Sequence, residues 1–369
     1  MIQFVSHLDG DGGWKRHATG LARALDRYER TELLGVHEPT RRGVAAAVRR
    51  WRVRRSRDSV GITLGAVERT AELGTRFRVA FGVAETTRIA RPVRLLLHAA
   101  DMVWTMSHWG RDVLAWNTIP AERIRIVPAG VDTTEFVPPA RPRADPVFRF
   151  LCVGEWQERK GTAALVRAFA AEFDPREPVE LVMHCGSNWT RRVHFREAIR
   201  RIVAASARGR ARVVPSDPVS RAAYVALLQG ADAFVLATRG EGWGLPILEA
   251  MACGLPCIVT DYSAVRDFAN ASNAYLIPVD AMERADDRGE FVDPRYEYGL
   301  WAIPDEGHLR RLLRHVVEHR EEARRVGAQA RRDAVRYWSW DLAARAALRH
   351  VAELRGGAVP SDHGAASRG

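Results

Sequence analysis

Lysine is nearly absent from this chain. The 369 residues include 56 lysines and arginines, yet Lys15 and Lys160 are the only lysines. The formal net charge of +11 therefore comes from arginine, a bias typical of whole-genome composition rather than of selection for an anionic partner. A basic nucleic-acid-binding protein is a rival interpretation, but no recognition module or aromatic stacking pattern accompanies the charge, so we expect no specific nucleic-acid partner.

Cysteine and long apolar runs are also scarce. The four cysteines form no C-x-x-C pair, which favours buried thiols in a reducing compartment over a disulfide or zinc framework; they are Cys152, Cys185, Cys253 and Cys257. No apolar run approaches the roughly 18 residues of a membrane span. The first residues are too short an apolar run for a signal peptide, so we expect a cytoplasmic protein.

Short apolar runs alternate with helical patterns, which indicates a parallel α/β sheet. The strands expected in the first half are 2–6, 33–36, 60–64, 79–83, 102–105 and 124–127, with a helix at 18–28. Those expected in the second half are 150–153, 181–184, 211–214, 233–237 and 257–260, followed by helical patterns at 306–335 and 338–354.

A proline-rich stretch without periodicity at 138–146 predicts an extended linker between two domains, the number that this length favours. We predict a Rossmann-like domain over 1–137 and a second over 147–335, facing each other across a central cleft. A helix over 336–355 is expected to pack back on the first domain. The small residues of 356–369 are expected to form a disordered tail.

Two acids eight positions apart, Glu241 and Glu249, frame the most informative segment. A strand pattern at 233–237 precedes them, and Pro246 fits the first turn of a helix. The unit is strand, glycine-rich loop and helix, with Glu249 expected in the first helical turn. In an open parallel sheet such a loop lies at the carboxyl edge, where ligands bind, and the helix N-terminus suits a phosphate.

This segment resembles the E-x7-E signature of glycosyltransferase family 4, enzymes of the GT-B fold that transfer a sugar from a nucleotide. The resemblance implies a retaining, metal-independent hexosyltransferase with a UDP- or GDP-sugar as co-substrate, no other cofactor and no metal ligand. It implies that Glu241 is the catalytic residue at the transferred sugar and that Glu249 binds the ribose. The diphosphate would meet Gly244 and Leu245, and the donor sugar Gly242 and Trp243. The alternative is an ordinary strand-to-helix loop, with a solvated Glu241 and a Glu249 that only complements the helix dipole.

A second segment, 150–161, predicts a strand, a turn and the start of a helix, and it resembles the diphosphate-binding G-R-x-x-x-x-K-G segment of the same family. Lys160 matches the family lysine. Fixed cations must stabilise a leaving diphosphate when no metal is present. Glu155 replaces the family arginine, and Arg159 is the candidate to supply the missing charge.

Two further groups are candidates by position. Gly12 and Gly13 follow the first strand, where the family has a glycine pair that approaches the donor phosphates. Glu85, Thr86 and Arg88 end another strand and should face the cleft. They are candidates for acceptor binding, and equally for pinning the helix that follows.

The stretch 41–57 contains eight arginines and no acid, with Trp51 in the middle. It predicts either a peripheral contact with the inner membrane face or a solvated helix with its tryptophan packed on the sheet. The expected partners are a nucleotide-sugar donor and an unidentified acceptor, which is a small molecule, a glycan or a lipid-linked sugar. The alternative function is a non-catalytic nucleotide-sugar-binding protein or an inactive partner subunit.

Overall fold

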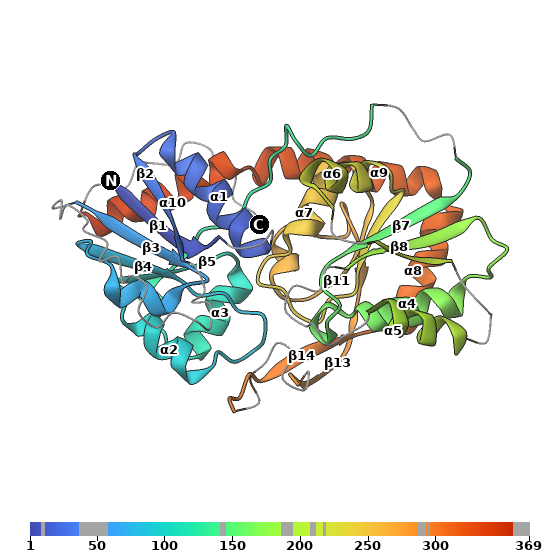
Figure 1. Ribbon diagram of the computed structural model, residues 1–369, viewed down its shortest axis with the longest axis horizontal. Coiled ribbons are helices and arrows are strands. Elements are labelled where there is room, and N and C mark those ends of the chain that lie inside the picture. Colours follow the sequence, from blue (N-terminus) through green and yellow to red (C-terminus); the bar gives the residue numbers. More distant parts are fainter. Residues whose placement is uncertain are drawn as a thin grey trace, which may run out of the picture.

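The computed structural model describes residues 1–8, 12–36, 58–140, 145–185, 195–206, 212–216, 219–286, 293 and 295–356. These residues form two six-stranded sheets, each flanked by helices, and a two-stranded hairpin. The sheets lie in two lobes beside each other, the first coloured blue to cyan and the second green to orange (Figure 1). All strand pairs within the two large sheets are parallel.

The first sheet has the strand order β2-β1-β3-β4-β5-β6. Its strands are β1 (Ile2–His7), β2 (Thr31–Val36), β3 (Val60–Leu64), β4 (Phe77–Phe81), β5 (Met102–Thr105) and β6 (Ile124–Ile126). Its helices are α1 (Gly13–Asp26), α2 (Arg91–His98) and α3 (His108–Trp116). Central strand β3 is buried throughout, as expected for a parallel sheet covered by helices on both faces.

The second sheet has the order β12-β11-β10-β7-β8-β9. Its strands are β7 (Phe148–Val153), β8 (Val179–His184), β9 (Val213–Ser216), β10 (Ala233–Leu236), β11 (Cys257–Thr260) and β12 (Tyr275–Ile277). Its helices are α4 (Thr162–Glu172), α5 (Phe195–Ala204), α6 (Arg221–Gln229), α7 (Leu245–Ala252), α8 (Glu306–Glu318) and α9 (Arg320–Tyr337). The strand order reverses between β7 and β10, so the loops after these two strands border the crevice where such sheets bind ligands.

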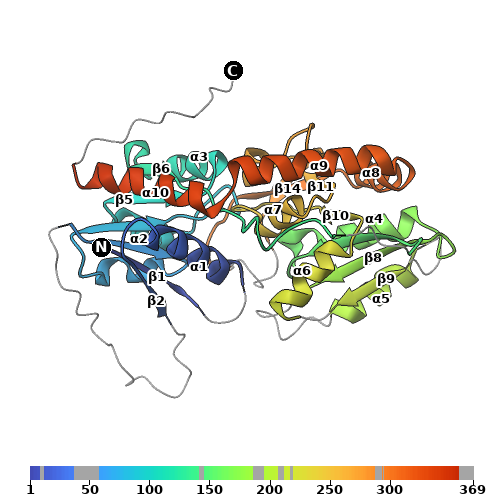
Figure 2. The ribbon, with the colours of Figure 1, turned by 90° about the horizontal axis from the view of Figure 1, so that it is seen from above.

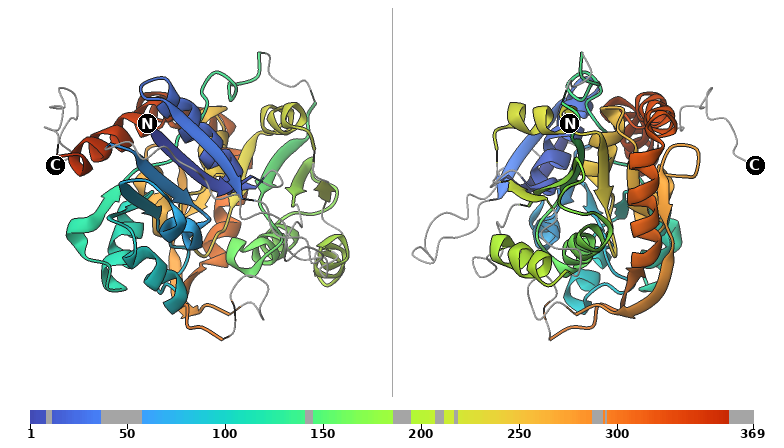
Figure 3. Two further views of the ribbon diagram at one scale, coloured as in Figure 1. Left: turned by 60° about the vertical axis from the view of Figure 1, so that its left-hand side comes forward. Right: turned by 90° about the vertical axis from the view of Figure 1, so that its right-hand side faces the viewer.

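The last helix, α10 (Trp340–Leu354), returns to the first lobe and packs against α1. Figures 2 and 3 show this red helix beside the blue N-terminal elements. The Arg355 guanidinium binds the Glu29 carboxylate at 2.6 and 2.7 Å, and Val131 forms a parallel bridge with Ser339. The C-terminal segment therefore joins the two lobes a second time.

The structure corrects several predicted boundaries. The helix expected at 18–28 is α1 and begins five residues earlier, and the strand expected at 211–214 is β9. The helical pattern at 306–335 is two helices, because His319 leaves the helical conformation with φ −114° and ψ 52°. The hairpin of β13 (Val279–Arg284) and β14 (Leu300–Pro304) was not expected, since β13 is mostly exposed and lacks an apolar alternation.

The four cysteines are free and buried, as predicted. Within the part of the chain that the structure describes, no helix has the length and apolar character required to cross a bilayer. The stretch 41–57, for which a membrane contact was one hypothesis, lies outside the described residues, as do residues 9–11, which precede Gly12, and the tail beyond Gly356.

Candidate functional site

The loops that follow β7 and β10 are bonded to each other through their backbones. The Arg239 amide donates to the Arg159 carbonyl at 2.8 Å. Gly161, between η3 (Glu158–Lys160) and α4, has φ +63°, and a Cβ atom there would lie 1.9 Å from the Ala237 carbonyl oxygen. Only glycine fits this close approach, so the two loops hold Lys160 and Glu241 at one place.

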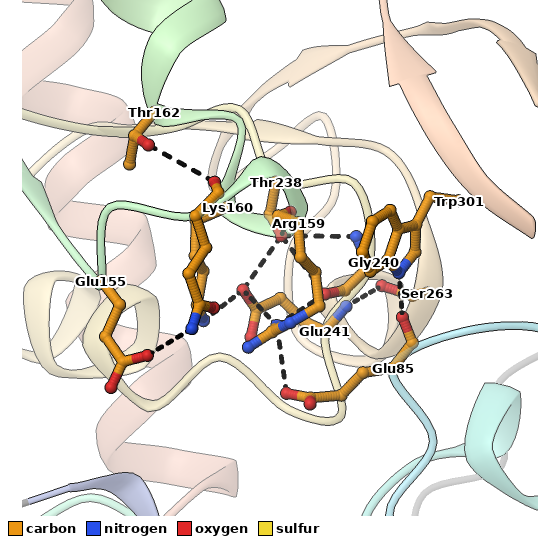
Figure 4. Close-up of polar contacts among 11 residues, drawn as sticks. Glu85, Glu155, Arg159, Lys160, Thr162, Thr238, Gly240, Glu241, Ser263 and Trp301 are labelled. Atoms are coloured by element: carbon orange, nitrogen blue, oxygen red, sulfur yellow. Dashed lines mark hydrogen bonds and ion pairs between the residues drawn. The ribbon is translucent and has the colours of Figure 1, made fainter. Parts of the chain in front are cut away.

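The Glu241 carboxylate is held by a lysine and a hydroxyl (Figure 4). Lys160 Nζ donates to Glu241 Oε1 at 2.7 Å, and Thr238 Oγ1 donates to the same oxygen at 3.0 Å. The Glu241 backbone amide donates to Ser263 Oγ at 2.9 Å. The Glu241 side chain is only 4% exposed, so it has one defined position before any ligand binds.

Arg159 lies between two carboxylates (Figure 4). Its Nη1 donates to the Gly240 carbonyl at 2.9 Å and lies 3.0 Å from Glu85 Oε1 and 3.6 Å from Glu241 Oε1. The side chain is 7% exposed. The guanidinium charge is thus engaged by two acids, and the predicted contact of Arg159 with a diphosphate would have to be shared with them.

Three acids of this cluster differ in their pKa. Burial would raise the pKa of Glu241, but the charges of Lys160 and Arg159 and the hydrogen bonds from Lys160 and Thr238 hold it below the ordinary value. Burial raises the pKa of Glu85 and of Glu155 in spite of the same two cations. Environments that separate the pKa values of neighbouring acids are typical of sites that handle charge and protons.

The second acid of the pair, Glu249, has different partners. Tyr224 Oη donates to Glu249 Oε2 at 2.6 Å, Arg16 Nη1 lies 3.3 Å from that oxygen, and Arg221 Nη1 lies 3.5 Å from Oε1. Burial and then the Glu249 charge raise the pKa of Tyr224 well above its ordinary value, so the phenol stays a donor. The two acids of the signature therefore occupy separate polar environments.

The predicted position of Glu249 in the first helical turn is wrong. Helix α7 begins at Leu245 after Gly244, which caps it with φ +102°, and no acid stands in its first turn. Glu249 is the fifth residue and follows one full turn. Pro246 occupies the first turn, as expected, because its missing amide needs no helical partner there.

The glycines and the tryptophan between the acids pack tightly. A Cβ atom at Gly242 would lie 2.4 Å from Val83 Cγ1, so this loop touches the first lobe directly. The Trp243 ring is 3% exposed and packs 5.1 Å from Phe268 and 5.3 Å from Trp338, measured between ring centroids. A contact of Trp243 with a donor sugar would therefore come from its backbone.

The three acceptor candidates separate in the structure. Glu85 joins the Arg159 cluster, and the Trp301 indole N–H donates to its carbonyl at 3.0 Å. Thr86 Oγ1 is bonded to the Arg88 carbonyl at 2.7 Å and stabilises the turn. The Arg88 side chain is 59% exposed and pairs with Glu297. Of the three, Glu85 alone contacts the cluster formed by Arg159, Lys160 and Glu241.

Several residues of the site were missed in the sequence. They are Arg16, Arg221, Tyr224, Thr238, Ser263 and Trp301. Arg16 follows the glycine pair by three residues, and its charge was the one available signal. The others reach the site from elements whose packing no local pattern specifies.

The two lobes, each a parallel sheet with its crevice at the carboxyl ends of the strands, define the GT-B fold. Solved glycosyltransferases share it. HepE of Anabaena in complex with UDP-glucose superposes with a TM-score of 0.69 at 12% identity, covering 96% of this chain and 99% of that one. WaaG, a glycosyltransferase involved in lipopolysaccharide biosynthesis, superposes with a TM-score of 0.64 at 16% identity, covering 97% and 100%.

Sequence comparison agrees with the fold. Residues 147–288 match the family of glycosyl transferases group 1. The D-inositol 3-phosphate glycosyltransferase of Pseudarthrobacter chlorophenolicus is 32% identical over 169 residues, 44% of this chain and 37% of that protein. The lipopolysaccharide core biosynthesis mannosyltransferase LpsB of Rhizobium meliloti is 26% identical over 275 residues, 69% and 72% of the two chains. The matches to three D-inositol 3-phosphate glycosyltransferases, including the one from Pseudarthrobacter chlorophenolicus, span less than half of the length of those proteins.

Proposed function

We propose that this protein is a retaining glycosyltransferase that moves a sugar from a nucleoside diphosphate to an acceptor hydroxyl without a metal. The observation that carries the proposal is the buried Lys160–Glu241 pair at the carboxyl edge of the second sheet, with Glu241 four residues before α7. The match of residues 147–288 to glycosyl transferases group 1 and the GT-B fold support it.

The proposed chemistry assigns the negative charge of the leaving group to Lys160 and to the backbone amides at the start of α7. The bond from the sugar C1 to the phosphate oxygen breaks, and the acceptor oxygen bonds to C1 on the same face. The acceptor proton passes to the leaving phosphate oxygen, so no protein nucleophile is required. Glu241, kept ionised by its cations, accepts hydrogen bonds from the sugar hydroxyls and orients C1.

The acceptor side of the proposal rests on Glu85. Its carboxyl contacts Arg159 at 3.0 Å and comes from the loop after β4 in the first lobe, opposite the donor loops. Burial raises its pKa, and its carboxylate oxygens can accept a hydrogen bond from an acceptor hydroxyl. We propose a polyhydroxylated acceptor, free or lipid-linked, by similarity to the relatives that act on inositol phosphate and on lipopolysaccharide core.

One observation favours a second candidate, a nucleotide-sugar-binding protein without turnover. Glu155 stands where the family arginine is expected, and the cluster around Lys160 contains three carboxyl groups and two cations. A phosphate site with so many acids has less positive charge for a leaving group. Turnover, rather than binding, separates the two candidates.

A thermal-shift screen with UDP-, GDP-, ADP- and dTDP-sugars tests the donor. Donors that carry one of the four bases should raise the melting temperature of the protein. A ligand at 100 times its Kd stabilises the folded state by about 2.7 kcal/mol. The donor that binds then enters a release assay with acceptor, with and without a chelator. No shift with any of the four would refute the proposed function.

Alanine at Gly12 or Gly13 tests whether a phosphate approaches the start of α1. A Cβ atom at either position would meet no atom within 4 Å, so Gly12→Ala and Gly13→Ala should keep the parental melting temperature. If the donor phosphates lie against this backbone, the added methyl group should weaken donor binding about tenfold or more by calorimetry. Unchanged affinity in both variants would remove the glycine pair from the donor site.

Glutamine at Glu249 tests the ribose assignment. Glu249→Gln should weaken a free nucleoside diphosphate and its sugar donor alike, by about tenfold, because both carry the ribose. Glu135→Gln is a matched control, since Glu135 shares Arg221 with Glu249 but its side chain is 33% exposed, against 5% for Glu249. A loss confined to the sugar-bearing donor would place Glu249 at the sugar instead.

A further inference from the structure

Arg16 extends from the first lobe to an acid of the second. It stands in the first turn of α1, and its Nη1 lies 3.3 Å from Glu249 Oε2. Its guanidinium lies over the Tyr224 ring, 5.6 Å from the centroid, and the side chain is 25% exposed. A partly exposed cation at a lobe junction is placed to meet a ligand that enters between the lobes.

The space beside Arg16 leads to the start of α7. A small hollow of about 30 Å³ is lined by Arg16, Arg221, Leu245, Glu249 and Trp340, among others. Leu245 is the first residue of α7, and Glu241, the partner of Lys160, precedes this helix by four residues. Three cations thus flank the helix start: Lys160 lies on the Glu241 side, and Arg16 from the first lobe and Arg221 from the second lie on the Glu249 side.

The donor loops of the second lobe offer little positive charge beyond Lys160. Position 155 is an acid, Glu155, whose Oε2 accepts a hydrogen bond from the side-chain Nε2 of Gln157 at 2.6 Å. Arg159 is buried and engaged by Glu85 and Glu241. A diphosphate on Lys160 would therefore meet more acid than base unless another element contributes a cation.

We propose that Arg16 supplies the second cation to the donor diphosphate and replaces the arginine that position 155 lacks. The proposal rests on the proposed function and names the contact from the first lobe. A guanidinium offers a fork of donors, so it can serve the Glu249 carboxylate and a phosphate oxygen together. The diphosphate then bridges Lys160 of one lobe and Arg16 of the other, and donor binding holds the lobes together.

The test is a mutant cycle read by calorimetry with the nucleoside diphosphate of the base that binds the parent, titrated to millimolar concentration. The variants are Arg16→Gln, Arg16→Lys and Glu249→Gln, with the double variant Arg16→Gln/Glu249→Gln. Arg23→Gln is the matched control, because Arg23 is an exposed arginine on the same helix. Melting temperatures confirm that each variant is folded.

Arg16→Gln should weaken the diphosphate about tenfold or more, in the parent and again in the Glu249→Gln background, while Arg23→Gln stays within about twofold. Arg16→Lys should recover part of the loss, since it keeps the charge without the fork. If the loss disappears in the Glu249→Gln background, Arg16 only orients Glu249 and the proposal is overturned. A parent that binds none of the nucleotides would instead refute the proposed function itself.

Discussion

Alanine at Glu241 should lower turnover by about 100-fold or more while nucleoside diphosphate binding stays equal or becomes stronger. Glu241 holds the ammonium of Lys160 at 2.7 Å, so its removal frees that cation for a phosphate. The same removal takes away the carboxylate that orients the sugar. Ground-state binding of the nucleotide and stabilisation of the transition state should therefore change in opposite directions.

Steady-state kinetics at saturating donor, with calorimetry of the free nucleotide, measure both quantities. Glu241→Gln keeps the shape of the side chain and should show a smaller loss of turnover. Glu158→Gln is the matched control, because Glu158 belongs to the same loop as Lys160 but its side chain is 59% exposed. Near-parental turnover for Glu241→Ala would remove this residue from the mechanism and favour the binding-protein candidate.

Alanine at Lys160 should weaken donor binding by about 10- to 100-fold, the range for losing one charged hydrogen bond to a phosphate. The Lys160 side chain is 13% exposed, so little solvent is available to replace its charge. The same change should alter the pH profile. Lys160 holds the pKa of Glu241 below its ordinary value, and burial acts in the opposite direction. Without the lysine, Glu241 takes up a proton at higher pH, so the pH below which turnover is lost should be higher than in the parent.

Two variants keep the Lys160 test specific. Lys160→Arg retains the charge. It should keep most of the donor affinity, and its turnover should fall at the same acidic pH as that of the parent. Arg167→Gln, an exposed cation on α4 that pairs with Glu306, should leave both unchanged. Donor affinity in Lys160→Ala equal to that of the parent would show that the phosphate binds elsewhere.

The fold and the centre of the site could be predicted from the sequence because each depends on local patterns. The runs that form β7 and β10 are apolar and are followed by glycine-rich loops, and both loops end at a helix. Parallel strands place such loops at one edge, so Lys160 and Glu241 were expected in one site. The structure brings their side chains within 2.7 Å.

The rest depends on how the lobes pack. Arg16 and Glu249 are 233 positions apart and belong to different sheets, and the contact between Trp301 and Glu85 joins a hairpin to the opposite lobe. Side-chain direction was equally hidden. The Arg159 guanidinium points toward Glu85 and Glu241, because it binds the Gly240 carbonyl and the Glu85 carboxylate.

The residue at which α7 begins, between Glu241 and Glu249, could not be predicted from the sequence either. The glycines before Leu245 permit several starting points for α7, and the position of Gly244 in the left-handed region decides among them. That conformation lies outside what composition specifies, so Glu249 was placed one turn too early. Its partners, Tyr224 and Arg221, come from α6, and their contacts with Glu249 depend on tertiary packing that no local pattern specifies.

Release of nucleoside diphosphate from the donor that binds distinguishes a glycosyltransferase from a binding protein of the same fold. Purified parent protein, its donor and a panel of polyhydroxylated and lipid-linked acceptors are incubated together, and released nucleotide and transferred sugar are both quantified. We expect release well above the spontaneous rate, with one nucleotide released for each sugar transferred, and loss of this release in Glu241→Ala. Saturable donor binding with no release above the spontaneous rate for any acceptor would contradict it and identify a binding protein.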